Sequence, residues 1–236
     1  MEIFDNICNF VSVNVAPAIM KKFIVVLFCF FLLCSATAQN NAAANKKLAG
    51  DKIITGVFNY DLAVQILDET NRQREAAGVP PLKMTKLLCE MAMLRAAEAT
   101  PDLPHAYDNP HNRPNGQMFY TILDKVERCS RTSENIHYGS FDAQRIVTNW
   151  MSSEGHRRNL LDSLVTTIGV GAFVWFDDDG ELVDVIVSTQ LFSDCLTNLD
   201  YRPSGAEKVQ VKITSKPDTK SKIIKREEYK VSPDTD

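Results

Sequence analysis

The chain has 236 residues and a formal net charge of −4. Residues 39–201 carry 15 basic and 22 acidic side chains, a net charge of −7, whereas residues 202–236 carry 9 and 6, a net charge of +3. The acidic body excludes a nucleic-acid groove as the main function, because such grooves gather Lys and Arg against the phosphates. The basic end is interpreted as a solvated extension.

The first 38 residues have the pattern of an export signal. Lys21 and Lys22 form a short basic region after Met20, residues 23–34 are apolar, and residues 36–38 (Ala-Thr-Ala) have the form of a signal-peptidase site. Met20 is the better candidate for the start, and the apolar run is shorter than the ~20 residues of a membrane span. We predict a cleaved signal peptide, no transmembrane anchor after processing, and a secreted or extracytoplasmic protein, at the cell surface or in the periplasm.

About 200 residues follow the signal, enough for one domain with a core of its own. Residues 39–59 are rich in Asn, Ala and Lys and are predicted to be a linker. We place the domain at 60–196 and a basic, flexible tail at 197–236, although alternating apolar residues over 209–213 could add an edge strand.

Three cysteines follow the signal, namely Cys89, Cys129 and Cys195. Export permits a disulfide, but the spacing does not select the pair. Cys89 falls in a helical pattern, as a small buried hydrophobic residue would. Cys129 and Cys195 fall next to predicted loops and are the favoured pair.

The first predicted helix covers residues 60–77. Asn59 can cap its start, and Gly78 ends it. Its apolar positions recur at helical spacing, which predicts one buried stripe. The stripe consists of Leu62, Ala63, Ile66, Leu67 and Thr70.

The second predicted helix begins at Thr85 and is closed by Pro101. We expect its charged residues Arg95 and Glu98 on the solvated side. Its apolar positions share a face with small residues, and that face consists of Leu87, Met91, Ala92, Leu94 and Ala96.

Two shorter helices follow a proline-rich loop over 101–115. The sequence pattern of residues 117–126 predicts a short helix. Residues 140–151 form an amphipathic run with Ser140 as a plausible N-cap and Gly155 as a plausible stop.

The pattern then changes to that of a β-hairpin. Residues 168–176 alternate as in a strand, and residues 182–192 are apolar and β-branched. Between them, residues 177–180 (Asp-Asp-Asp-Gly) supply a turn. A calcium loop is rejected, because an EF-hand needs ligands at alternate positions and a closing Glu.

Three polar segments stand out from this background. Ser133-Glu134-Asn135-Ile136 precedes the amphipathic helix, residues 152–160 follow it with Glu154 and His156, and residues 111–116 lie upstream and begin with His111. Two His and two Glu on separate segments meet only if the fold brings these segments together.

The order of these motifs resembles that of the CAP superfamily, which comprises cysteine-rich secretory proteins, antigen 5 and pathogenesis-related proteins. The resemblance is closest to the bacterial, SCP-like extracellular branch. It covers about residues 60–192. The motifs that carry it are Asn71-Arg72, Pro81-Leu82, His111 with Arg113-Pro114-Asn115-Gly116, Ser133-Glu134-Asn135-Ile136, Trp150-Met151, Gly155-His156-Arg157 with Asn159-Leu160, and Ile168-Gly169-Val170-Gly171.

The resemblance implies an α+β fold of the CAP type, an α-β-α sandwich with a small antiparallel sheet between helices. It also implies a central cleft lined by two His and two Glu. The matching residues are His111, Glu134 and His156, with Glu154 as the fourth and less secure match, because many bacterial members lack the second Glu. The chain has few cysteines and no Cys-rich C-terminal domain, so channel-directed or venom-type activities are not carried over.

Structural roles compete with these functional ones. Glu134 can bond backbone amides, and a cationic His156 is favoured at the end of a helix by the helix dipole. His105 and His137 match no family position and are interpreted as surface or loop residues. Trp150 and Trp175 are expected in the core.

For function, the resemblance favours a monomeric binding module whose ligand is an apolar small molecule such as a lipid, or a cell-envelope or host polymer. The alternative is a metal-assisted, peptidase-like hydrolase that uses the same cleft. No catalytic residue is established, because the chain has neither a G-x-S-x-G nor an H-E-x-x-H motif. No cofactor is required, but His111 and His156 could hold Zn²⁺ weakly, as two imidazoles without a thiolate.

Overall fold

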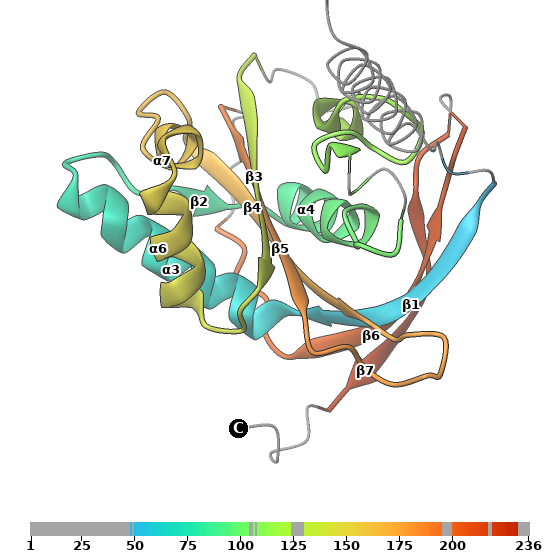
Figure 1. Ribbon diagram of the computed structural model, residues 1–236. Coiled ribbons are helices and arrows are strands. Elements are labelled where there is room, and N and C mark those ends of the chain that lie inside the picture. Colours follow the sequence, from blue (N-terminus) through green and yellow to red (C-terminus); the bar gives the residue numbers. More distant parts are fainter. Residues whose placement is uncertain are drawn as a thin grey trace, which may run out of the picture. The chain divides into compact units, whose positions relative to one another are not determined.

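The computed structural model describes residues 48, 50–103, 106, 108–123, 130–194, 200–216 and 219–230. The predicted signal peptide, His105 and the favoured cysteine pair lie outside these residues. In the described part, one sheet is covered by helices on both faces, which is the predicted α+β sandwich (Figure 1). None of the described helices combines the length and the hydrophobicity of a membrane-spanning segment.

The sheet of the described part has seven strands, and its main path runs β3-β5-β4-β1-β6-β7. Neighbours along this path are antiparallel, and the short β2 pairs with β4 in parallel. The strands are β1 (Lys52–Asn59), β2 (Lys83–Met84), β3 (Thr132–Gly139), β4 (Thr167–Trp175), β5 (Ile186–Ser193), β6 (Ala206–Ile213) and β7 (Lys222–Tyr229).

Two predictions about the ends of the domain are wrong. The end of the predicted linker is strand β1, which pairs with both β4 and β6, and the predicted tail contains the β6–β7 hairpin. In β6, the alternating residues Val209, Val211 and Ile213 are buried, so this alternation was a real strand signal. Strand β7 is an edge with mostly exposed side chains, so its sequence has no apolar face by which to recognise it.

Helix α3 (Tyr60–Ala76) confirms the first predicted helix. The side-chain oxygen of Asn59 accepts a hydrogen bond from the backbone N–H of Leu62, as an N-cap does, and Gly78 follows the helix with φ of +70°. All five residues of the predicted stripe are buried. Their stripe fixes the face that α3 turns to the core.

Helix α4 (Lys86–Glu98) is capped by Thr85 as predicted, but its buried face differs from the prediction. Leu87 is 41% exposed, whereas the small residues of the helix lie against the sheet. A Cβ on Gly169 would come within 2.0 Å of the Leu88 carbonyl oxygen, and one on Gly171 within 2.3 Å of the Ala92 carbonyl oxygen. The two glycines of β4 therefore let the backbone of α4 pack closely on the sheet.

The amphipathic run over 140–151 forms helix α6 (Ala143–Ser152), and a second, unpredicted helix, α7 (Glu154–Leu160), follows it. Asp142, not Ser140, caps α6: its carboxylate accepts from the Arg145 backbone N–H at 2.7 Å. Gly155 is not a stop but the second residue of α7. Helix α4 lies on one face of the sheet, and α3, α6 and α7 lie on the other (Figure 1).

The remaining local predictions are largely confirmed. Strands β4 and β5 form the predicted hairpin, and the Asp177 carboxylate accepts from two backbone N–H groups of the turn. Residues 117–126 hold a 3₁₀ helix, η1 (Phe119–Leu123), and residues 124–126 lie outside the described part. Trp150, Trp175 and Cys89 are all buried, as predicted.

Candidate functional site

Strand β3 places Glu134 beside His111. The Glu134 side chain is fully buried, and its Oε2 lies 2.9 Å from Nδ1 of His111, whose side chain is 36% exposed. Nε2 of His111 makes no hydrogen bond to another described residue. The carboxylate therefore fixes the imidazole ring through one nitrogen and leaves the other nitrogen available.

A chain of buried charges continues from Glu134 into the protein. Arg95 donates from Nε to Glu134 Oε1 at 2.7 Å and from Nη1 to Glu98 Oε2 at 2.8 Å. Arg113 then donates to both oxygens of Glu98, at 2.8 and 3.0 Å. Arginine and glutamate alternate along this chain, so each buried charge meets charges of the opposite sign.

This network contradicts the expectation that Arg95 and Glu98 lie on a solvated helix face, because both side chains are 0% exposed. Burial by itself raises the pKa of Glu98, but the charges and hydrogen bonds of Arg113 and Arg95 outweigh it and lower the pKa to about 2. Burial lowers the pKa of Arg95, but Glu134 and Glu98 outweigh it and raise that pKa. Arg95 and Glu98 are therefore both ionised at neutral pH.

The β6–β7 hairpin also supports this network. Ser221, the residue before β7, hydrogen-bonds to Glu98 and helps to keep its pKa low. The carbonyl of Thr219 accepts from the side-chain amide of Asn115, in the loop that carries His111, at 3.5 Å. The segment interpreted as a tail is thus part of the frame that holds this loop.

Helix α7 is tied to β3 by amide side chains, and this places His156. Asn135 donates from Nδ2 to the His156 carbonyl at 3.2 Å and to Gln190 Oε1 at 3.1 Å. Asn159 donates to the Glu134 carbonyl at 3.2 Å and to Asn135 Oδ1 at 3.0 Å. Glu134, which holds His111, is thereby bound to the helix that carries His156. We call His111, Glu134 and His156 the histidine site.

The pKa of His156 is lowered by its surroundings. Burial lowers the pKa of His156, and the nearby charge of His111 lowers it further. His156 is therefore a neutral imidazole at pH 7, with a nitrogen lone pair that can accept a hydrogen bond or bind a metal ion.

His137 is not the surface or loop residue that the sequence suggested. It lies on β3, where Asn149 Nδ2 contacts its Nε2 at 3.1 Å, and its buried Nδ1 has no hydrogen-bond partner among the residues that the structure describes. Burial, followed by the charges of Arg145 and His156, lowers its pKa.

Glu154 makes no hydrogen bond or ion pair with His111, Glu134 or His156 in the described part of the chain, so its role in the histidine site stays a prediction. It is exposed in the first turn of α7, and its carboxylate makes no ion pair or hydrogen bond with another described residue. Within the described ranges, no group of three or more His, Cys, Asp or Glu side chains is arranged to hold a metal ion. Glu134 orients His111, and weak binding of an ion by His111 and His156 stays a prediction.

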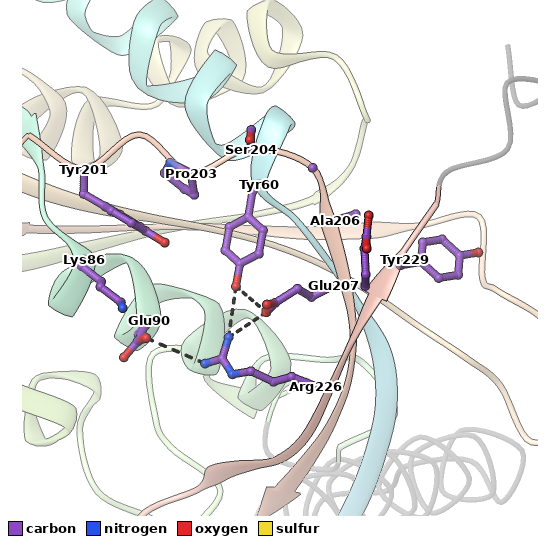
Figure 2. Close-up of a pocket in the computed structure, with 12 residues that line it drawn as sticks. Tyr60, Lys86, Glu90, Tyr201, Pro203, Ser204, Ala206, Glu207, Arg226 and Tyr229 are labelled. Atoms are coloured by element: carbon purple, nitrogen blue, oxygen red, sulfur yellow. Dashed lines mark hydrogen bonds and ion pairs between the residues drawn. The ribbon is translucent and has the colours of Figure 1, made fainter.

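Two pockets lie away from the histidine site. One, of about 760 Å³, lies between the start of α4 and the β6–β7 hairpin (Figure 2). The other, of about 340 Å³, lies beside Trp175 and the turn after β4. His111, Glu134 and His156 line neither pocket.

The sequence interpretation missed Arg95, Glu98 and Arg113. A usable signal exists, because the last turns of α4 surround Arg95 and Glu98 with small residues. Arginine and glutamate three residues apart on a helix can pair with each other. Small neighbours bring such a pair close to the sheet, so an alanine-rich helix end with this pair favours a buried ion pair.

The chain matches known proteins over its central part. Residues 67–185, just over half of the chain, match the profile of the cysteine-rich secretory protein family, CAP. The uncharacterized protein YkwD of Bacillus subtilis is 27% identical over 143 residues, which cover 58% of this chain and 53% of the relative. The uncharacterized membrane protein YlbC of the same organism is 30% identical over 45% of this chain and 30% of its own length. The chain thus spans about half, or less, of these relatives.

Among solved structures, an extracellular SCP-domain protein from Bacillus anthracis is 25% identical with a TM-score of 0.47, covering 57% of this chain and 41% of that protein. An outer surface protein of Borrelia burgdorferi is 18% identical with a TM-score of 0.45, covering 58% of this chain and 94% of that protein. At these scores the assignment to a family rests on the profile match.

Proposed function

This chain belongs to the cysteine-rich secretory protein (CAP) family, and from that premise we propose that it is a secreted bacterial binding module. Its binding surface is the histidine site, and its ligand is a lipid or a component of the cell envelope or of a host. The proposal is supported most directly by the way Glu134 holds His111, with Nδ1 engaged at 2.9 Å and Nε2 left without a partner among the described residues.

The burial of the charges behind His111 supports binding rather than proton transfer. Glu134 is bound by Arg95 as well as by His111, so its oxygens are occupied by donors from the protein. A carboxylate that must take a proton during catalysis gains nothing from an arginine that stabilises its charged form. The same partners make Glu134 a rigid support for the imidazole ring.

An imidazole nitrogen that carries no proton can accept a hydrogen bond from a polar head group, and it can also bind a divalent cation. Zn²⁺ would have His111 and His156 as its protein ligands, so its binding should be weak and reversible. Binding should decline as the pH falls through the histidine range near ~6.5, because protons compete for the same nitrogens.

Calorimetry with ZnCl₂ tests the metal-binding part. We expect uptake by the wild type at pH 7.5, a clear loss of uptake at pH 5.5, and no uptake by the double variant His111→Ala/His156→Ala. Glu154→Gln is the matched control, because the exposed Glu154 carboxylate makes no hydrogen bond or ion pair with either histidine in the described part of the chain, and it should bind as the wild type does. Equal uptake by the wild type and the double variant would refute the site.

Binding of the proposed ligands is tested by incubating the mature chain with lipid extract and with purified cell envelope. We expect saturable retention that the double variant loses and Glu154→Gln keeps. Retention that is insensitive to the double variant would place the interface elsewhere on the molecule.

A metal-assisted hydrolase is the alternative function, and one observation favours it. A carboxylate on the second nitrogen of a histidine is the arrangement that orients metal-bound imidazoles in zinc enzymes. A hydrolase should turn over peptides or esters in a broad screen, and His156→Ala should abolish that turnover. Such a result would replace the binding module as the preferred function.

A further inference from the structure

The larger of the two pockets described above lies outside the histidine site and is built mainly by segments that the family profile does not cover. Its volume is about 760 Å³, within the range of small-molecule sites. Apart from Lys86 and Glu90 on α4, every residue that lines it lies outside 67–185. The β6–β7 hairpin and the segment leading into it form most of its wall (Figure 2).

The centre of this pocket is a preorganised set of three polar side chains. The Tyr60 hydroxyl donates to Glu207 Oε2 at 2.8 Å, and Arg226 Nη1 donates to the same Oε2 at 2.7 Å and to the Tyr60 hydroxyl at 3.2 Å. Figure 2 shows these contacts, together with the ion pair from Arg226 to Glu90 at 3.9 Å. Mutual bonding holds the groups in place before any ligand arrives, which lowers the entropic cost of binding.

Other polar groups of the pocket have unused bonding capacity. The ammonium group of Lys86 and the hydroxyls of Tyr201 and Tyr229 make no hydrogen bond or ion pair with another described residue. The rings of Tyr201 and Tyr229 are partly buried, so each offers an apolar surface beside its hydroxyl. The wall thus combines donors, acceptors and aromatic faces.

The charges of the pocket argue against a charged ligand. Glu90, Glu207 and Glu228 outnumber Lys86 and Arg226, and Arg226 is already engaged by Glu207 and Tyr60. An anion such as phosphate would face surplus negative charge, and an amine would face the central guanidinium. An apolar ligand would leave the polar groups of the wall without partners, which costs free energy.

We propose that this pocket binds a short neutral oligosaccharide. Sugar hydroxyls both donate and accept hydrogen bonds, so they can use the ammonium, carboxylate and phenol groups of the wall together. The C–H faces of a sugar ring are apolar and can pack on the tyrosine rings.

The saccharide pocket is separate from the histidine site. Lys86 and Glu98 are the first and last residues of α4, ~18 Å apart along the helix axis. Lys86 lines the pocket, whereas Glu98 belongs to the buried network behind His111. The two sites therefore occupy opposite ends of one helix and can be disabled one at a time.

Titration of the full chain with triacetylchitotriose, maltotriose and inorganic phosphate, followed by saturation-transfer NMR and calorimetry, tests the proposal. We expect saturable binding of at least one of the two sugars and none of phosphate. Tyr201→Ala should weaken sugar binding roughly tenfold, because it removes an aromatic face. Lys86 is exposed, so Lys86→Gln should not impair folding. This variant should weaken sugar binding roughly fivefold.

Two controls make the result specific. Tyr120→Ala removes an exposed tyrosine that does not line the pocket, and it should bind sugar as the wild type does. The double variant His111→Ala/His156→Ala should also keep sugar binding, which separates this proposal from the proposed function. Absence of binding of both sugars, binding of phosphate alone, or unchanged affinity in Lys86→Gln and Tyr201→Ala would overturn the saccharide pocket.

Discussion

The two ends of helix α4 hold charged groups in opposite environments. At the C-terminal end, Arg95 and Glu98 are 0% exposed and each is bonded to charged partners. At the N-terminal end, Lys86 is exposed and forms no ion pair with another described residue, and the Arg226 and Glu207 side chains are 37% and 33% exposed. One end of the helix uses its charges within the protein, and the other presents them to solvent.

This difference shows that the buried charges have a structural role, whereas the exposed charges can take part in binding. Charges removed from water must be fully paired, and a fully paired group has no capacity left for a ligand. The buried network therefore supports His111 without itself being a site. The groups at the other end keep part of their hydration and can exchange water for a ligand.

Glu98→Gln should have the largest effect on stability. It removes the carboxylate that joins Arg95 to Arg113 and leaves two buried guanidinium groups short of negative charge. Removing one partner from a buried ion pair costs about 3–5 kcal/mol, so we expect a loss of this size in the free energy of unfolding. Urea unfolding should show a lower midpoint with an unchanged m-value. A loss below about 1 kcal/mol would mean that the network is hydrated rather than sealed.

An intermediate effect is expected when the pH falls from 7.5 to 5.5. Burial lowers the pKa values of His137 and His156 in the folded protein. Below ~6.5 the unfolded chain takes up protons that the folded protein does not, so the stability present above this pH is lost as the pH falls through the folded pKa values.

His137→Gln should remove part of this pH dependence. Urea unfolding at both pH values in the presence of a chelator measures it, with Tyr120→Ala as the control that keeps the full dependence. An identical pH slope in the wild type and His137→Gln would show that His137 is not shielded from water.

The sequence predicted those parts of the fold that have a periodic apolar pattern or a strong cap. Helix α3 with Asn59, the start of α4 at Thr85 and the β4–β5 hairpin belong to this group. Strand β7 escaped prediction because it is an exposed edge, and its place in the sheet is set by pairing with β6 rather than by side-chain pattern.

The residues of the candidate sites also fall into those that sequence motifs predict and those that depend on tertiary packing. The segments of His111, Glu134 and His156 were recognisable as motifs, and the fold does connect them. The buried state of Arg95 and Glu98 depends on how closely α4 approaches the glycines of β4, which is a tertiary property. The pocket brings together residues more than a hundred positions apart in the sequence, such as Tyr60 and Arg226, so no local sequence pattern predicts it.

The smallest effect is expected for Glu207→Gln, the matched change at the other end of α4. The amide oxygen of Gln can still accept from Arg226 and Tyr60, and the partly exposed pair contributes little, so the stability should change by less than about 1 kcal/mol. The change should shrink further in high salt, because solvent-exposed charges are screened. Urea unfolding under the conditions used for Glu98→Gln, at low and at high salt, measures both the change in stability and its dependence on salt. A loss as large as that of Glu98→Gln would show that the pocket charges are structural too, and the contrast between the two ends of the helix would fail.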